Sequence, residues 1–370
     1  MAKLQEATLR GLAQREANSL VIGIDLGDRS SNYCVRVRSS QEVLVEGKIA
    51  TTPQAVAEWF QRLQRQRVTM ETGTHARWVA ELLRLMRHEA VVGNARKLKL
   101  ITENDQKSDQ VDARLLSKLG CVEVGWLHPV YQRSGETHRD LMRVRAREAL
   151  VETRTGLINH VRGAVKSYGC RISECSAEQF HMVAGKELPE SLRGVLSNVL
   201  EAVEELSEQI HRYDCEVKEL CARKYPQTKW LLQIQGVGPI TALTFVLTIE
   251  DAERFEDSRD VGAYLGLVAK RRQSGKRDPQ LGITKAGDEM LRKLLVNCAH
   301  YILGRGPDTD LRRWGLHLLA AGQQAGKNQR DARKRAAAAL ARKLAVLLHR
   351  LWVNEWEYEP LRNQAVATAA

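Results

Sequence analysis

Four acidic residues in the first third of the chain have types and spacing that suit a site for divalent metal ions. Asp25 and Glu71 each end a short apolar segment, whereas Asp109 and Asp112 lie three residues apart, a spacing that puts both on one face of a helix. A carboxylate that ends a buried strand is costly unless a cation or hydrogen-bond donors compensate it. Carboxylate oxygens are the ligands that Mg²⁺ or Mn²⁺ prefers, and two such ions can assist an in-line phosphoryl transfer.

Each of these acids also has an ordinary explanation. Asp25 precedes a glycine turn, Asp25-Leu26-Gly27, and a helical Asp-x-x-Asp is most often a solvated face. Asp105 competes for the same helix face, since it lies four residues before Asp109, although it also suits a helical first turn. The metal hypothesis therefore depends on all four acids occurring in an order that fits one α/β domain.

A serine in a strongly basic segment is the second candidate for chemistry. Ser274 lies in the sequence RRQSGKR. A serine hydroxyl is a weak nucleophile until it is oriented or deprotonated, and neighbouring cations can favour the alkoxide and attract a phosphate. From composition alone such a segment is most often only a flexible loop that contacts DNA. The candidate phosphate contacts around it are Lys270, Arg271, Arg272, Lys276, Arg277, Lys285 and Arg292.

A glycine turn before an apolar segment predicts a helix-hairpin-helix over Leu232 to Thr244. Gly236 and Gly238 permit a tight turn, Pro239 suits the first helical position, and Thr241 lies nearby. Backbone N–H groups at the start of such a helix can hold a phosphate without reading sequence. The alternative is a plain turn between two packed helices.

Hydrophobic periodicity predicts an α/β N-terminal part followed by a helical remainder. The pattern indicates a β-hairpin over Leu20 to Val37, further strands over 42–50, 68–71 and 90–92, and helices over 53–63, 75–87 and 102–119. Long helices over 137–168 and 189–225 follow, the second with a heptad seam, so we expect an antiparallel coiled-coil pair. Further helices are expected over 288–303 and 327–356.

The segments that hold these candidates resemble one family. IGIDLG, METG and KSDQVDARLL in the first half, and YLGLVAKRRQSGKRDPQLGITKAGDEMLRKLL in the second, are similar to insertion-sequence transposases with a DEDD-type RuvC-like domain and a C-terminal serine-containing domain, the bridge-RNA-guided serine recombinases. The resemblance covers most of the chain, from about Leu20 to Leu303. It implies an RNase H-like fold in which Asp25, Glu71, Asp109 and Asp112 bind the metal, and it implies that Ser274 is the nucleophile joined to a DNA end.

The resemblance also implies partners and a division of the chain. The partners are donor and target DNA, a guide RNA and further copies of the chain in a dimer or tetramer, with composite sites formed within one subunit or between subunits. The expected parts are an N-terminal extension (1–19), a RuvC-like catalytic domain (20–130), a helical coiled-coil segment (131–228), a C-terminal transposase domain (229–326) and a basic helical tail (327–370).

Composition restricts the remaining choices. The 370 residues include 57 Lys and Arg against 45 Asp and Glu, a net charge of +12 that favours a polyanionic partner. No apolar run reaches the roughly 20 residues that cross a bilayer, and the N-terminus lacks the apolar core of a secretion signal. Seven scattered cysteines without a CxxC pair indicate free thiols in a reducing cytoplasm, and the resemblance implies a bacterial, nucleoid-associated protein.

Three other functions remain open at this point. A structure-specific endonuclease of the Holliday-junction resolvase kind would use metal-activated water, with Ser274 only a contact. An actin- or Hsp70-like ATPase is suggested by IGIDLGDRSS, which resembles that superfamily's first phosphate loop, but the later glycine-rich adenosine loops are missing. A DNA-binding module without chemistry is the third.

Overall fold

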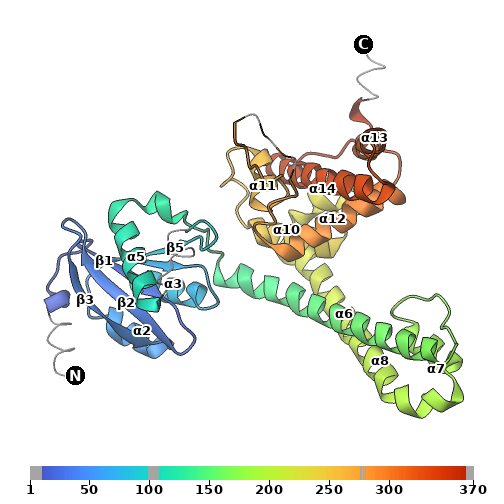
Figure 1. The fold of residues 1–370 in the computed structure, drawn as a ribbon, viewed down its shortest axis with the longest axis horizontal. Coiled ribbons are helices and arrows are strands. Elements are labelled where there is room, and N and C mark those ends of the chain that lie inside the picture. Colours follow the sequence, from blue (N-terminus) through green and yellow to red (C-terminus); the bar gives the residue numbers. More distant parts are fainter. Residues whose placement is uncertain (1–10, 99–107, 276, 278, 280, 364–370) are drawn as a thin grey trace. The chain divides into compact units, whose positions relative to one another are not determined.

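The chain divides into two compact units, one that ends at Arg133 and one that begins at Ser134. The computed structural model describes residues 11–98, 108–275, 277, 279 and 281–363 (Figure 1). Asp105 and Lys276, both singled out from the sequence, lie outside the described residues. Among the described helices, none is long and apolar enough to cross a lipid bilayer.

A mixed five-stranded sheet forms the centre of the N-terminal unit. Its strands lie in the order β3-β2-β1-β4-β5, with β1 antiparallel to β2 and parallel to β4. The strands are β1 (Leu20–Asp25), β2 (Ser30–Val37), β3 (Val43–Ala50), β4 (Arg67–Glu71) and β5 (Glu89–Gly93). The predicted α/β class and each predicted strand are therefore confirmed, with outer boundaries that shift by no more than one residue.

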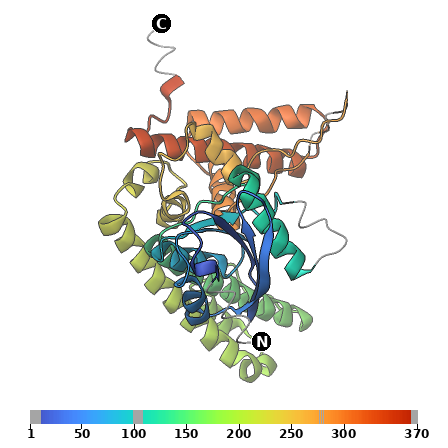
Figure 2. The ribbon, with the colours of Figure 1, turned by 90° about the vertical axis from the view of Figure 1, so that its left-hand side faces the viewer.

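Helices cover both faces of this sheet. Ile22 and Ile24 point into a core shared with α2 (Pro53–Phe60) and α3 (Ala76–Leu85). Side chains alternate along a strand, so the residues between them face the other side, where α5 (Asp109–Val122) packs (Figure 2). A short 3₁₀ helix over 124–127 ends this layer.

Helix α5 lies unusually close to strand β1 because two glycines remove the side chains between them. A β-carbon on Gly23 would stand 2.2 Å from the carbonyl oxygen of Ala113 and 2.3 Å from the amide nitrogen of Ser117. A β-carbon on Gly120 would stand 2.6 Å from Cγ2 of Thr69. Thr69 on β4 adds a hydrogen bond, since its Oγ1 donates to the carbonyl of Leu116 at 2.9 Å. The helix is thus fixed to the sheet along its length.

An antiparallel helix pair opens the C-terminal unit, as the heptad pattern predicts. Helix α6 (Gly135–Ser167) is followed by α7 (Phe180–Glu187) and then by α8 (Glu190–Glu219), which packs back along α6 (Figure 1). One of the two rows of the heptad is buried, namely Leu196, Val203, Ile210 and Val217. A π-helical turn over 220–224 ends α8.

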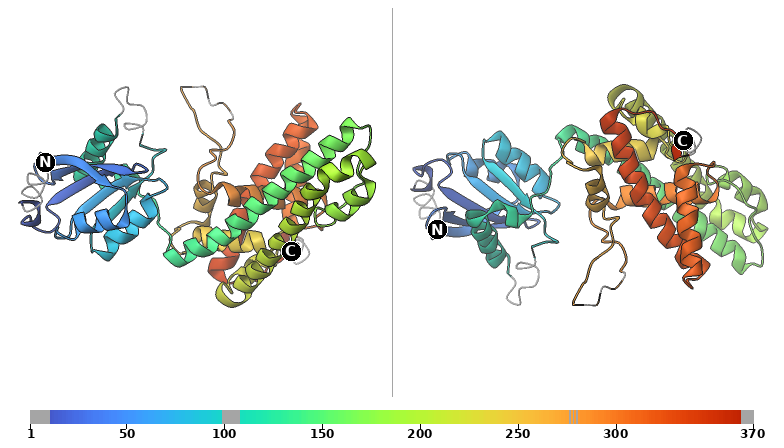
Figure 3. Two further views of the ribbon diagram at one scale, coloured as in Figure 1. Left: turned by 90° about the horizontal axis from the view of Figure 1, so that it is seen from below. Right: turned by 90° about the horizontal axis from the view of Figure 1, so that it is seen from above.

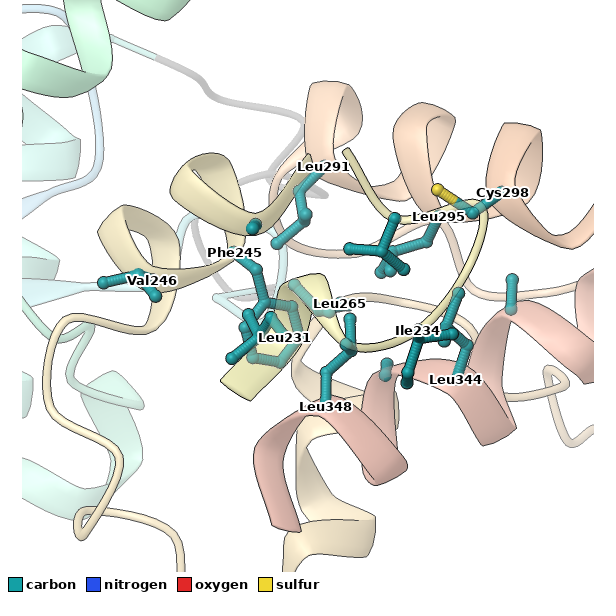
Figure 4. Packing of buried hydrophobic residues seen from close by; sticks show 14 of the residues in the cluster. Leu231, Ile234, Phe245, Val246, Leu265, Leu291, Leu295, Cys298, Leu344 and Leu348 are labelled. Atoms are coloured by element: carbon teal, nitrogen blue, oxygen red, sulfur yellow. The ribbon is translucent and has the colours of Figure 1, made fainter. Parts of the chain in front are cut away.

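The rest of this unit is a helical core. It comprises α9 (Thr228–Leu232), α10 (Pro239–Ile249), α11 (Ser258–Tyr264), α12 (Glu289–Gly304), α13 (Asp310–Gln324) and α14 (Gln329–Asn354). Phe245, Leu295 and Leu348 meet at its centre (Figure 4). The helix expected in the basic tail is therefore present, but its apolar face is part of this core rather than an appendage.

A buried ion cluster joins the base of α6 to the end of α8. Asp140 is 1% exposed and forms ion pairs with Arg143 and Lys224. Its Oδ2 also accepts a hydrogen bond from the Tyr225 hydroxyl at 2.7 Å. Burial alone would raise the pKa of Asp140, but the donors Lys224 and Tyr225 outweigh it and hold that pKa below its usual range. Burial and the Asp140 carboxylate together raise the pKa of Tyr225 to about 12.

The close approach of α5 predicts that Gly23→Ala destabilises the N-terminal unit. The added methyl group overlaps backbone atoms that cannot move aside singly, so we expect a loss of about 1–3 kcal/mol in the free energy of unfolding. Urea unfolding measures it. Gly73→Ala is the matched control, because a β-carbon there meets nothing within 4 Å. Equal stability of the two variants would show that α5 is not held as described.

The ion cluster predicts that Asp140→Asn loses about 2–3 kcal/mol at neutral pH, because Lys224 and Arg143 lose their buried partner while staying partly solvated. The pKa of Asp140 is lower in the folded protein than in the unfolded chain, where it is near 3.9. The Asp140 carboxylate therefore stabilises the fold fully above the unfolded-state pKa, and this stabilisation is lost as the pH falls through the folded-state pKa. The stability difference between wild type and variant should therefore shrink in acid. Glu190→Gln, which alters an exposed pair with Arg193, should change little. A difference that persists in acid would contradict the assignment.

Candidate active site

Two of the predicted acids lie side by side at one edge of the sheet. Asp25 is the last residue of β1 and Glu71 is the last residue of β4. These strands are parallel neighbours, and Ile24 is paired with Met70. The next residue of each strand is the acid, so the register brings Asp25 and Glu71 to adjacent positions at the carboxyl edge.

Helix α5 begins at this same edge and supplies the other two acids. Ser108 caps the helix, since its side chain accepts a hydrogen bond from the backbone N–H of Val111. Asp109 is exposed, whereas Asp112, one turn later, is 6% exposed. The close packing of α5 at Gly23 holds this first turn beside the end of β1.

Asn32 is a site residue that the sequence patterns did not reveal. It lies opposite Asp25 in the β1–β2 pair and is 2% exposed. Its side-chain amide nitrogen lies 3.4 Å from Oδ2 of Asp109, as a hydrogen-bond donor. The residue links the sheet edge to the start of α5. The sequence feature that could have identified Asn32 is a polar residue that faces Asp25 across the predicted hairpin.

The donor set fits a hard divalent cation such as Mg²⁺ or Mn²⁺. All four predicted ligands are carboxylates, and one oxygen each of Glu71 and Asp112 is shielded from solvent. Within the described residues, no group of three or more His, Cys, Asp and Glu side chains is close enough to hold an ion. The fold therefore brings the four acids to one edge without closing them around a single point.

His75 extends the polar edge. It precedes α3, and its Nδ1 accepts a hydrogen bond from the Trp78 indole at 3.0 Å. The accepting role of Nδ1 assigns the proton to Nε2, which faces a carboxylate oxygen of Asp28 at 3.7 Å. From the sequence, this histidine is expected to be an isolated surface or packing residue. The structure gives it a fixed ring orientation.

Ser274 lies at the tip of a basic hairpin, which we call the arm (described residues 267–275, 277, 279 and 281–284). Backbone bridges pair Ala269 with Ile283 and Ser274 with Arg277, and Gly275 completes the tip with a φ of +56°. Figure 3 shows the arm projecting from the helices of its unit. The serine and its predicted basic neighbours Lys270, Arg271, Arg272 and Arg277 are exposed.

Arg292 joins the two sides of the base of the arm by hydrogen bonds. This arginine is 9% exposed, and its guanidinium donates to the carbonyls of Leu265 at 3.2 Å and Ala286 at 2.6 Å. Gly266 and Gly287 have φ values of +69° and +68°, and a β-carbon on either would overlap backbone of the opposite side. Arg292, predicted as a phosphate contact, directs these hydrogen bonds to the backbone at the base of the arm. Lys285 lies at the same junction with a φ of +56°.

The turn of the predicted helix-hairpin-helix is present, but the threonine that follows it, Thr241, is buried. Gly236 has a φ of +101° and packs against Tyr301, and the exposed Gly238 caps α10. Thr241 is 6% exposed, with its hydroxyl 3.6 Å from the Cys298 sulfur. The threonine side chain is therefore turned into the core, which leaves the backbone N–H groups at the start of α10 as the part of the motif suited to a phosphate.

Comparisons with known proteins identify both halves of the chain. Residues 22–170 match the DEDD transposase domain of IS110 elements, described as a transposase, and residues 228–311 match the family described as Transposase IS116/IS110/IS902 family. These two stretches contain the acidic edge and the arm.

Bacterial relatives agree with these matches. The transposase for insertion sequence element IS1111A of Coxiella burnetii is 30% identical over 58% of this chain and 58% of its own length. A putative transposase of Sinorhizobium fredii is 31% identical over 70% of this chain and 66% of its own length. The transposase for insertion sequence element IS1328 of Yersinia enterocolitica is 27% identical over 78% of this chain and 85% of its own length. The alignments thus span less than two thirds of the first two relatives. Taken with the two domain matches, they show that the chain carries transposase domains of the IS110 and IS116/IS110/IS902 kinds and is similar to bacterial insertion-sequence transposases.

Proposed function

We propose that this protein is an insertion-sequence transposase that cuts and rejoins DNA with Ser274 as nucleophile and metal-binding acids as the second half of its active site. The observation that carries the proposal is the meeting of Asp25, Glu71 and the first turn of α5 at one edge of a mixed sheet. The strand order and the helix packed across β1 are those expected of an RNase H-like, RuvC-like domain.

The acids would bind and orient the ions. Mg²⁺ or Mn²⁺ held there would neutralise charge on a phosphate and on the oxygens that enter and leave it. Asp25 and Glu71 come from strands and are fixed by the sheet, whereas Asp109 and Asp112 depend on the position of α5. Asn32 restrains the exposed Asp109 carboxylate, so this acid can join the set without being buried.

The arm would supply the covalent step. The Ser274 hydroxyl loses its proton as its oxygen bonds to the scissile phosphorus, and the bond from phosphorus to a deoxyribose oxygen breaks. That oxygen takes up a proton and leaves as a hydroxyl. In the second step a hydroxyl of another DNA end attacks the phosphoserine and restores the serine. The number of phosphodiester bonds is conserved, so no ATP is needed.

The basic residues would hold the DNA during both steps. Arg271, Arg272 and Arg277 flank the serine and can neutralise the phosphate, and Lys270 continues the basic surface. The amides after Gly238 offer a further backbone contact. A guide RNA and further copies of the chain complete the proposal, as does an association with the bacterial nucleoid.

A second function is favoured by the division into units. The acids and Ser274 belong to different compact units, so the N-terminal unit could cut DNA with metal-activated water alone. The protein would then be a structure-specific endonuclease of the resolvase kind.

Removal of a single acid should abolish cleavage. Asp25→Asn and Asp112→Asn keep size and polarity but remove a charge from the cation site, so we expect the rate of Mg²⁺-dependent cutting of element-end DNA to fall roughly a hundredfold or more. The assay uses protein purified with its bound RNA. Asp28→Asn is the control, because this nearby acid is 94% exposed. Full activity of both site variants would refute the acidic edge as the active site.

The serine step predicts a covalent protein–DNA adduct. Wild type incubated with element-end DNA and Mg²⁺ should yield a species that survives denaturation and carries a nucleotide on Ser274 by mass spectrometry. Ser274→Ala should lose both adduct and cleavage, whereas Gln273→Ala, its exposed neighbour, should retain them. Cleavage that persists in Ser274→Ala but disappears in Asp25→Asn would establish the water mechanism instead.

A further inference from the structure

A groove of about 910 Å³ lies beside the base of the arm, within the C-terminal unit. Helix α13 contributes Trp314 and Leu318, helix α14 contributes Val346, and the arm itself contributes Leu267 and Ile283. These side chains make its lining largely apolar. The groove therefore shares a wall with the hairpin that carries Ser274.

Basic residues surround this apolar lining. Arg259, Lys327, Lys334, Arg335, Arg342 and Lys343 line the groove, and no acidic residue is among the described residues that do so. Lys343 holds its ammonium 4.3 Å from the centre of the Trp314 ring. Burial lowers the pKa of Lys343, so an anion that enters the groove would stabilise the charged form of this lysine.

An occupant must match both properties. A purely apolar protein segment would leave the cations uncompensated, and a DNA duplex would present phosphates while keeping the faces of its bases stacked inside. An unpaired strand offers both at once, because each nucleotide carries a flat apolar base and a phosphate. Positive grooves with an aromatic side chain for stacking are the usual means of holding such strands.

The distance from the groove to Ser274 indicates which DNA strand would lie in the groove. Ala269 lines the groove, and Ser274 lies five residues further along the same side of the arm. At roughly 3.3 Å per residue this path spans up to about 17 Å. It matches about five base steps of roughly 3.4 Å each. A strand whose phosphate reaches the tip of the arm would therefore have its neighbouring nucleotides at the groove.

We infer that this groove binds an unpaired segment of the DNA strand that Ser274 attacks, with a base against Trp314 and phosphates on Lys334 and Arg342. The inference rests on the proposed function for the identity of the strand. It adds a site outside the acidic edge and the arm tip.

Binding of a fluorescein-labelled single strand of about 16 nucleotides to the full-length protein, followed by anisotropy, tests this site. Trp314→Ala should weaken binding at least fivefold, and Trp314→Phe, which keeps an aromatic face, should restore most of it. Trp356→Ala is the control, since Trp356 is 51% exposed and does not line the groove.

A second variant tests the charges without altering the apolar core. Lys334→Gln combined with Arg342→Gln should reduce the slope of log affinity against log salt by about 0.7 for each phosphate that the groove no longer neutralises. Arg350→Gln combined with Arg333→Gln changes two exposed residues of the same helix that do not line the groove, and should reduce the slope less.

Three results would overturn the inference. The first is unchanged affinity for the DNA single strand in both groove variants. The second is that the variants lose as much affinity for a duplex of the same sequence as for the single strand. The third is that a single-stranded RNA of the same sequence binds the wild type more tightly than the DNA does, and that the variants weaken only the binding of this RNA. If the groove variants lose binding as expected but wild type forms no adduct, the serine mechanism fails while the groove stands. If wild type forms the adduct but the groove variants bind normally, the serine mechanism stands and the groove fails.

Discussion

The contact between helix α5 and strand β1 is the constraint on which the acidic edge depends. Gly23 lets the backbone of α5 lie where a side chain would otherwise stand, and Gly120 does the same further along the helix. Hydrogen bonds from Thr69 and Arg67 to carbonyls of the helix reinforce this contact. Because β1 ends at Asp25, a helix fixed to β1 also fixes Asp109 and Asp112 relative to that acid. The glycines thus determine the geometry of a site that they do not touch.

The two units divide the electrostatics of the proposed reaction. The N-terminal unit gathers carboxylates at one edge, where they suit cations, whereas the C-terminal unit presents guanidinium and ammonium groups around Ser274 and along α14. One polyanion can satisfy both, since its phosphates bind directly to the basic groups and through metal ions to the acidic ones. The net charge of +12 is therefore better understood as a consequence of this division than as a uniformly basic surface.

Local patterns in the sequence were sufficient for most of the N-terminal unit. Apolar runs that end in Asp25 and Glu71 predicted two strands, and the parallel pairing of those strands follows from the crossover through helix α2 that leads from β3 to β4. The long helix pair was predicted because its heptad row is contiguous in sequence.

Features made by distant residues could not be predicted in this way. Arg292 has the type of a phosphate contact, but its burial depends on the turns at Gly266 and Gly287. Thr241 is turned inward because α12 covers it, and α14 has the composition of a basic tail although its Ala and Leu face is core. The groove beside the arm requires α13, which no sequence pattern indicated.

The central claim is that the acidic edge and Ser274 act on the same phosphate, within one subunit or between two. A structure of the protein with guide RNA, element-end DNA and Mg²⁺ tests it most directly. The account predicts one scissile phosphate that contacts the Ser274 oxygen and a metal ion held by Asp25, Glu71 and Asp112. A metal-bound water aligned with that phosphate, with Ser274 remote from it, would contradict the account.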